Sequence, residues 1–448
     1  MAHWGIVGGG LLGMTLAHRL RQRGERVTLF EAGAGLGGLA SAWSIGGAVW
    51  DRHYHVILLS DSHLRALLAE IGLAHETRWS SAKSGFYVGG ELHSMSNVLE
   101  FLRFPPLNLL EKLRLAATIL YASRIRDWRP LERVLVADWL RRWSGAGTCE
   151  KIWLPLLRAK LGDCYRRTSA AFIWATIARM YAARRSGAKQ EVFGHVAGGY
   201  ARILERFTEV LRGAGVEIVL ETQVDAVRSG GSGRLGVALA AGGVREFDRV
   251  VLTVPAPLVP RLVPDLTREE AAALDRIEYV GIVCASLLLR RSLSDYYITS
   301  ITESWVPFTA VIEMSALVGR EPFGGNSLIY LPRYASPQDA VFERRDDELE
   351  RTFVDALRRM HPGLGADDVV AFRVSRARHV FALPTLGYSA ALPPTTTSVP
   401  GLHVVNSAHI VNGTLNVNET VQLAERMLPA LLAEAGAGGP IPAAGVRP

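Results

Sequence analysis

The sequence predicts an α/β fold organised around a parallel sheet, with an α+β region inserted into it. The main evidence lies in the first 31 residues, where a short apolar run at 4–7 predicts a strand and glycines follow it. Residues 11–23 then predict a helix that Gly24 ends, and residues 27–30 predict a second strand. Buried strands are predicted again at 216–224 and 248–255, after a long stretch of different character.

The first turn carries a nucleotide-binding motif. Gly8, Gly10 and Gly13 have the spacing G-x-G-x-x-G, and Glu31 follows Gly13 after eighteen residues. The first glycine permits a tight turn, the second a close approach of the backbone to a pyrophosphate, and the third close packing of helix on strand. Because strand, helix and acid all stand in place, we expect a bound dinucleotide; a glycine-rich turn without a ligand is the alternative.

Composition sets the class of protein. A chain of 448 residues with 49% hydrophobic and 21% charged residues is typical of a globular protein with two or three domains. No secretory leader is expected, and no apolar run is long enough for a transmembrane helix. Three widely spaced cysteines predict neither a disulfide framework nor a metal site, so we expect a reducing cytoplasm.

The net charge of +7 belongs to one segment. Residues 124–189 carry fifteen Lys and Arg against five Asp and Glu, so they contribute +10 and the rest sums to −3. This excludes a generally basic nucleic-acid-binding protein. The segment also holds five of the ten tryptophans. It is either a solvated basic face or a surface that meets an anion, such as a phosphorylated substrate or a lipid surface.

A second glycine cluster suggests a longer cofactor. Gly37 and Gly38 follow Glu31 closely, and with the first motif they resemble the signature of FAD-dependent oxidoreductases of the amine oxidase, protoporphyrinogen oxidase and phytoene desaturase superfamily. UDP-galactopyranose mutases share this signature. The resemblance implies a discontinuous Rossmann-like FAD-binding domain, an inserted substrate domain and a disordered tail. The implied FAD-binding domain comprises residues 1–75, 190–265 and 395–435. The implied substrate domain has a helical, basic part at 76–189 and a sheet part at 266–394, and the disordered tail is 436–448.

The resemblance also implies the cofactor contacts. They are Gly8, Gly10, Gly13, Glu31, Gly37, Gly38, Val224, Asn406, Asn416, Asn418 and Glu419. The chain departs from the family at two places, with Leu39 where many members have Arg and Asn406-Ser407 where relatives have Gly-Asp.

Catalytic and substrate contacts are expected in two regions. By the resemblance, the segment around residues 46–55 passes along the flavin ring, so His53 and His55 are the catalytic candidates, with satisfied core rings as the alternative. The substrate-binding candidates are Tyr54, Arg158, Lys160, Arg166, Arg179, Arg333 and Arg376. Two or three of these arginines could hold a diphosphate.

A helix predicted from Leu109 to about Arg126 has Leu109, Leu113, Ala116, Ala117 and Leu120 on one face. Such a stripe is typical of core packing. Peripheral contact with the inner membrane face stays an alternative, because relatives that act on lipophilic substrates rest on membranes.

The resemblance implies hydride transfer from a large, anionic or lipophilic small molecule to flavin N5. A simple amine fits poorly, because no Lys follows Lys189 and no Phe, Trp or Tyr follows Tyr388. The first alternative is a non-redox flavoenzyme resembling UDP-galactopyranose mutase, favoured by Thr309 and Glu313 and opposed by Ala310, where that family has Arg. The second is a binding protein with a vestigial flavin site.

Overall fold

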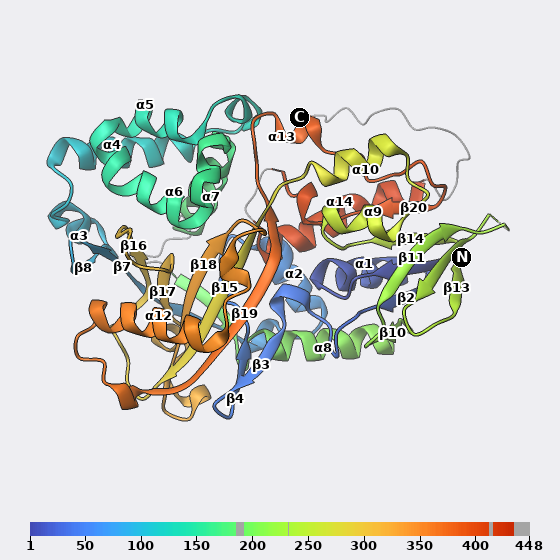
Figure 1. Ribbon diagram of the computed structural model, residues 1–448, viewed down its shortest axis with the longest axis horizontal. Helices are drawn as coiled ribbons and strands as arrows, with labels where there is room; N and C mark the ends of the chain where they lie inside the picture. The colour runs from blue at the N-terminus through green and yellow to red at the C-terminus, as the bar shows by residue number, and fades with distance from the viewer. Residues whose placement is uncertain (185–191, 232, 412–414, 434–448) are drawn as a thin grey trace.

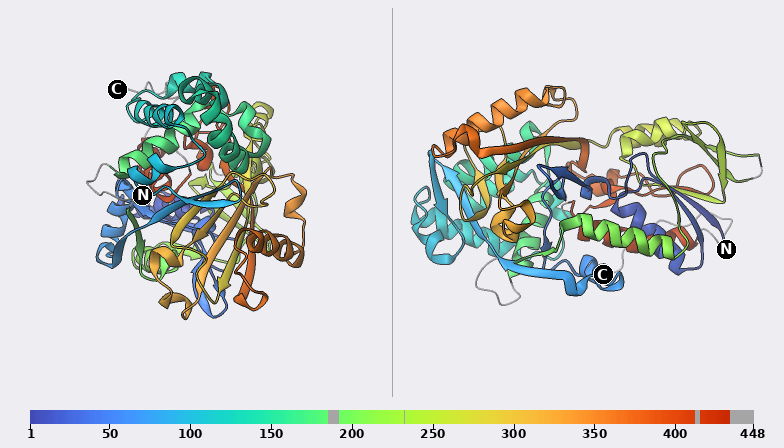
Figure 2. Two further views of the ribbon diagram at one scale, coloured as in Figure 1. Left: turned by 90° about the vertical axis from the view of Figure 1, so that its left-hand side faces the viewer. Right: turned by 90° about the horizontal axis from the view of Figure 1, so that it is seen from below.

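The computed structural model describes residues 1–184, 192–231, 233–411 and 415–433. It contains two large sheets, and a group of helices lies at the end of the molecule opposite the parallel sheet (Figures 1 and 2). Within this described part, every helix is too short or too polar to serve as a transmembrane segment.

The parallel sheet contains the N-terminal motif. Its strands, in spatial order, are β10 (Glu217–Val219), β2 (Arg26–Phe30), β1 (His3–Val7), β14 (Arg249–Leu252) and β20 (Leu402–Val404). All neighbouring pairs run parallel, and β1 lies at the centre. Three segments far apart in the sequence therefore build one sheet, and the predicted strands at 4–7, 27–30 and 248–255 are confirmed.

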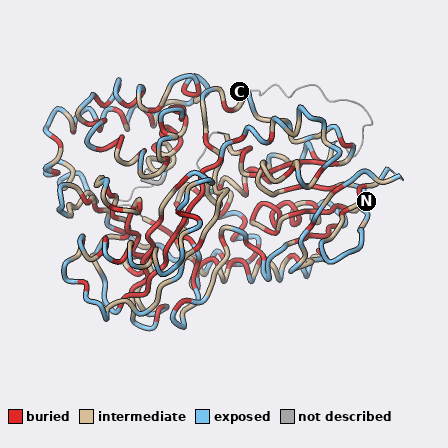
Figure 3. The backbone as a smooth tube through the Cα atoms, in the orientation of Figure 1, coloured by how far each residue is buried: buried red, intermediate tan, exposed pale blue. Residues whose placement is uncertain are grey.

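Alternate residues of this sheet enter two different cores, as the period of a strand requires. Ile6 and Val251 pack with α1 (Leu11–Gln22), α8 (Gly199–Gly213) and α14 (Val417–Ala433). Their neighbours Val7 and Val250 pack on the other face, against a meander and two short helices. These elements are β11 (Val224–Ser229), β12 (Leu235–Leu239), β13 (Val244–Phe247), α9 (Val259–Leu262) and α10 (Arg268–Asp275). Both faces are thus buried, which explains the continuous apolar runs of the strands (Figure 3).

A seven-stranded sheet forms the middle of the molecule. Its order is β19 (Val369–Ala382), β15 (Tyr279–Leu289), β18 (Ser327–Ala335), β17 (Ala310–Glu313), β16 (Tyr296–Ile301), β7 (Lys83–Val88) and β8 (Glu91–Ser94). Helix α12 (Asp346–Met360) packs on one face of it. Gly89 and Gly90 both have positive φ in the turn between β7 and β8, as a two-residue hairpin turn of type I′ requires.

The helical group comprises α3 (Val98–Arg103), α4 (Leu109–Ala122), α5 (Val136–Thr148), α6 (Leu154–Leu161) and α7 (Ala170–Arg184). A π-helical turn at Cys149–Trp153 joins α5 to α6. Trp139, Trp153 and Trp174 are buried in the core of this group, so the tryptophan-rich segment supplies mainly structure.

The remaining elements are smaller. They are a hairpin of β3 (Ala42–Ile45) and β4 (Ala48–Asp51), a sheet of β5 (Ile57–Leu58), β9 (Val192–Val196) and β6 (Thr77–Ser81), and the helices α2 (Ser62–Glu70), α11 (Ser315–Val318) and α13 (Tyr388–Ala391). Strands β6 to β8 lie within 76–189, a part that the resemblance implies to be helical. The predicted tail at 436–448 lies outside the described residues, as do Arg185 and Lys189, and the division into domains stays a prediction.

Candidate functional site

The first glycine turn is packed as its motif predicts. Gly8 has a φ of 112°, and its N–H donates to the Phe30 carbonyl over 3.0 Å. A Cβ on Gly13 would lie 2.0 Å from the Gly8 carbonyl oxygen. Gly13 is therefore required for α1 to pack on the turn, whether or not a ligand is bound.

Gly10 is different, because the protein itself leaves room at this position. A Cβ here would approach nothing closer than the Gly38 Cα, at 4.0 Å. Helix α1 begins directly afterwards, with no side-chain cap from a described residue and no acid in its first turn. Free N–H groups at a helix N-terminus bind phosphate. The space at Gly10 and these donors therefore fit the pyrophosphate of a dinucleotide.

Glu31 joins the two glycine clusters. Its Oε2 accepts from the Gly9 N–H over 2.8 Å, and its Oε1 accepts from the Gly33 N–H over 2.7 Å. Gly37 N–H donates to the Gly9 carbonyl over 2.8 Å, which holds the second cluster against the first. Val224 lies just beyond Thr222, whose N–H donates to the Glu31 carbonyl. The structure thus brings Glu31, Gly37 and Val224 close to the turn, and their contacts with a cofactor stay predictions.

The carboxy-terminal candidates serve mainly as caps. The buried Asn406 donates to the Val254 carbonyl over 3.0 Å and accepts from the Ala408 N–H over 3.1 Å. Asn416 accepts from the Glu419 N–H at the start of α14. Asn418 accepts from two N–H groups at the start of α2. These side chains position the backbone around the site, and their role toward a cofactor stays a prediction.

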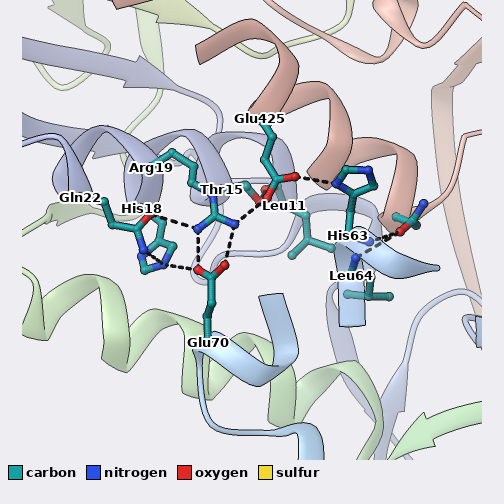
Figure 4. Close-up of polar contacts among 10 residues, drawn as sticks. Leu11, Thr15, His18, Arg19, Gln22, His63, Leu64, Glu70 and Glu425 are labelled. Atoms are coloured by element: carbon teal, nitrogen blue, oxygen red, sulfur yellow. Dashed lines mark hydrogen bonds and ion pairs between the residues drawn. The ribbon is translucent and has the colours of Figure 1, made fainter. Parts of the chain in front are cut away.

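A polar network fixes the middle of α14 against α1 and α2 (Figure 4). Arg19 of α1 donates to Glu70 of α2 and, over 2.6 Å, to Glu425 of α14. The second oxygen of Glu425 lies 2.6 Å from Nδ1 of His63. Three helices from distant parts of the chain are thereby held together, so the N-terminus of α14 has a defined direction.

The last residue of β4 and the segment that follows it contain buried groups with shifted pKa values. Asp51 accepts from the Tyr200 N–H over 2.8 Å, and burial raises the pKa of its carboxyl to about 8. His55 lies 3.9 Å from Asp51, and burial, with a smaller effect of His53, lowers the pKa of His55 to about 3. Burial also lowers the pKa of His53. At neutral pH both imidazoles are uncharged.

His53 has one ring nitrogen to offer a ligand. Its Nδ1 lies 3.0 Å from the Leu39 carbonyl, an acceptor, so the proton of the neutral ring belongs on Nδ1. Its buried Nε2 then accepts hydrogen bonds, and it has no partner among the described residues. A buried acceptor without a partner is costly unless a bound molecule satisfies it. This atom fits a cofactor or substrate donor, which supports His53 as a site residue.

A second cluster forms on the side chain of Tyr54. Its hydroxyl lies 2.7 Å from the Tyr334 hydroxyl of β18. The Lys160 Nζ of α6 lies 3.5 Å from the centroid of the Tyr334 ring and 5.6 Å from that of Phe381. Burial lowers the pKa of Lys160, opposed by Tyr54. Lys160 is half-buried, and no acid pairs with its ammonium group among the described residues, so the cluster is a half-buried cationic site without an anion.

The other predicted basic residues are not gathered there. Arg158 and Arg166 are exposed and lie over the ring of Tyr165. Arg179 forms an ion pair with Asp61, and Arg376 with Asp346. Arg333 is half-buried on β18. Of the predicted basic residues, Lys160 is the one placed beside Tyr54 and Tyr334, and binding of a diphosphate by Arg158 and Arg166 stays a prediction.

The sequence reasoning missed Tyr330, Tyr334 and Asp51 as parts of this region. Tyr330 donates to the Asp51 carbonyl over 2.6 Å, and Tyr334 contacts Tyr54. Residues i and i+4 of a strand share one face, so the spacing of Tyr330 and Tyr334 on β18 is the sequence signal that these two rings lie on the same side of the sheet.

We expect Asp51 to make stability depend on pH. The folded carboxyl keeps its proton up to a pH near 8, whereas the unfolded one loses it near 3.8, so stability falls as the pH rises between these values. Asp51→Asn retains an acceptor for the Tyr200 N–H but cannot ionise. Relative to this variant, the wild type should lose about 1–3 kcal/mol of unfolding free energy between pH 5 and pH 8 in urea titrations. Parallel pH profiles of the two proteins would contradict the assignment.

Comparison with known proteins gives concordant results. The family described as flavin containing amine oxidoreductase matches residues 13–422. Coproporphyrinogen III oxidase of Mycobacterium leprae is 28% identical over 321 residues, which is 64% of this chain and 67% of that protein. Zeta-carotene desaturase of Synechocystis sp. is 24% identical over 311 residues, 62% of each chain. The matched regions thus span about two thirds of these relatives or less.

Solved structures agree on the fold. A candidate protoporphyrinogen oxidase from Exiguobacterium sp. 255-15 superposes with a TM-score of 0.75 at 21% identity, covering 97% of this chain and 99% of that one. Reduced UDP-galactopyranose mutase gives a TM-score of 0.73 at 15% identity, covering 97% and 94%. At these identities the likeness shows the fold alone, and it confirms the predicted α/β class.

Proposed function

The chain belongs to the flavin-containing amine oxidoreductase family, and from that premise we propose that it oxidises a large substrate that carries a carboxylate, with FAD as its cofactor. The family match confirms the predicted resemblance, the flavin and the class of oxidoreductase. The substrate is our inference, and it depends chiefly on one observation, the half-buried and unpaired ammonium of Lys160 beside Tyr54 and Tyr334.

A half-buried cation without an anionic partner favours an anionic ligand over a hydrocarbon. The Tyr334 ring offsets part of the cost of burying Lys160, but it accepts none of the three N–H bonds that an ammonium can donate. A substrate carboxylate would accept them. Of the two curated relatives, one is named for coproporphyrinogen III, which carries carboxylates, and the other for a carotene, which carries none. A substrate that carries carboxylates fits Lys160 better than a carotene does.

One group of residues would bind the cofactor and another would bind the substrate. FAD, when bound, supplies a two-electron acceptor for the hydride that leaves the substrate. The glycine turns and the N-terminus of α1 would hold its pyrophosphate, and the Nε2 of His53 would accept a hydrogen bond. Lys160 would bind the substrate carboxylate, while the paired hydroxyls of Tyr54 and Tyr334 would orient the molecule.

The mutase alternative has less support in the side chains. Glu313, which matched the mutase segment, is buried and accepts from the N–H groups of Leu293 and Ser294. Burial raises the pKa of Glu313 to about 7. Its carboxyl is used to hold a loop, and Ala310 brings no charge to a phosphate.

The cellular location of the enzyme is also part of our proposal. We place the enzyme in a reducing compartment such as the cytoplasm, since Cys149, Cys164 and Cys284 are all free thiols.

Anaerobic mixing tests the proposed function. The purified FAD-loaded protein would receive coproporphyrinogen III, zeta-carotene or UDP-galactopyranose in turn, while the visible band of oxidised flavin is followed. We expect bleaching by coproporphyrinogen III. If no compound bleaches the flavin and the chemically reduced protein isomerises the sugar nucleotide, the mutase alternative is correct.

A further inference from the structure

Helix α4 carries its apolar residues on the outside. Leu109, Leu110 and Leu113 are 66%, 59% and 60% exposed, and Leu120 and Tyr121 are exposed on the same helix. The buried positions instead include polar residues, Lys112 and Thr118, beside Leu115 and Ala122. The prediction that this stripe packs in the core is therefore wrong. A soluble surface helix normally has the opposite arrangement.

Polar contacts fix this orientation. Lys112 donates to the Leu102 carbonyl over 2.7 Å, which also ties the helix to the end of α3. Thr118 accepts from Ser144 over 3.1 Å, and Ser144 accepts from the Trp153 indole over 2.9 Å. Since the inward polar groups are satisfied, rotating the helix to bury its leucines would leave these groups without partners. The exposure of these apolar side chains is therefore fixed by the way α4 packs in the fold.

Helix α3 extends this surface. Val98, Leu99 and Leu102 are also exposed. We define the α3–α4 face as Val98, Leu99, Leu102, Leu109, Leu110, Leu113, Leu120 and Tyr121. These eight residues are half of the sixteen exposed large hydrophobic residues in the described part of the chain. Such a concentration marks an interaction surface rather than scattered exposure.

Exposed arginines without an ion-pair partner among the described residues lie beside the α3–α4 face. Arg103, Arg114, Arg124 and Arg126 lie on or next to α3 and α4 and are exposed. None of them forms an ion pair with a described residue, whereas Lys151 pairs with Glu111. Tyr121 stacks on Trp143 with ring centroids 4.0 Å apart, and Trp143 is itself partly exposed. Leucines with flanking arginines and a Tyr–Trp pair are the composition of an interfacial membrane-binding surface.

We propose that the α3–α4 face docks on the surface of a bilayer that contains anionic lipids. The leucines would enter the boundary between headgroups and acyl chains, and the four arginines would meet the lipid phosphates. A second copy of the chain is a poorer occupant, because a two-fold interface would bring the unpaired arginines of both copies together. The inference does not depend on the identity of the substrate.

Vesicle sedimentation of the full-length, FAD-loaded protein tests this proposal. The vesicles would be phosphatidylcholine alone or an equal mixture with phosphatidylglycerol. We expect binding to the mixture, weakened by salt, and a loss of about tenfold or more in Leu109→Ser/Leu113→Ser. Arg124→Gln/Arg126→Gln should lose the preference for phosphatidylglycerol. Val244→Ser/Val370→Ser removes exposed apolar residues elsewhere and should bind as the wild type does.

Three outcomes would overturn the proposal. The wild type does not sediment with either kind of vesicle, or the leucine variant sediments as the wild type does. In the third, the wild type is a dimer, the leucine substitutions dissociate it, and vesicles bind neither the wild type nor the leucine variant. A second copy of the chain would then cover the α3–α4 face. The flavin content of each variant, read from its visible spectrum, shows that it is folded.

Discussion

A Gly10→Val variant is expected to fold and to lose its flavin completely. Gly10 has an extended backbone, with φ −68° and ψ 172°, which valine adopts readily. A Cβ there is 4.0 Å from its nearest neighbour, so the side chain begins in open space and we expect the protein to accommodate it when no ligand is bound. It would, however, occupy the space that the pyrophosphate needs. The measurement is the ratio of visible to ultraviolet absorbance after purification, with circular dichroism to verify folding.

Gly213→Val is the matched control. Gly213 ends α8 and lies outside the glycine clusters, and a Cβ on it would meet no heavy atom of the described residues within 4 Å. This variant should retain the wild-type flavin content. A Gly10→Val protein that is folded and yellow would contradict the placement of the cofactor.

Lys160→Met should produce the second large effect. A charge-assisted hydrogen bond contributes about 1.5–3 kcal/mol, so kcat/KM for coproporphyrinogen III should fall about 10- to 150-fold. Methionine keeps most of the volume and the apolar contacts with Tyr334 and Phe381, and FAD binding should not change. Steady-state kinetics with the visible spectrum as a control measure both quantities.

Lys83→Met controls for the loss of a lysine. Lys83 is exposed on β7 and pairs only with the exposed Asp295 among the described residues, so its removal should leave the kinetics unchanged. If Lys160→Met has wild-type kinetics, Lys160 is a core cation satisfied by the Tyr334 ring and binds no substrate.

The nucleotide-binding half of the site could be predicted because its signals are local. Within 31 residues, the glycine spacing specifies a turn, a close helix contact and an acid, and each has a separate steric or electrostatic reason. The packing of Gly13 on the Gly8 carbonyl is such a reason, and it holds independently of any ligand. The strand pattern of β1 and β2 follows equally from adjacent residues.

The substrate side could not be predicted in the same way. Tyr54, Lys160 and Tyr334 come from three distant segments, and only tertiary packing of α6 and of the segment after β4 against β18 brings them together. The charge of a segment also does not indicate how far each cation is withdrawn from solvent, so the half-buried Lys160 and the exposed Arg158 look equivalent in the sequence. The stripe on α4 shows the same limit, because periodicity identifies an apolar face but not whether protein, lipid or water covers it.

The most direct test compares coproporphyrinogen III with its tetramethyl ester under anaerobic, single-turnover conditions. The two compounds have the same reacting carbon skeleton and differ in their negative charge. We predict fast bleaching of the flavin by the acid and much slower bleaching by the ester, with the difference abolished in Lys160→Met. Equal rates for acid and ester in the wild type would contradict carboxylate recognition by Lys160, and no bleaching by either would contradict the proposed substrate class.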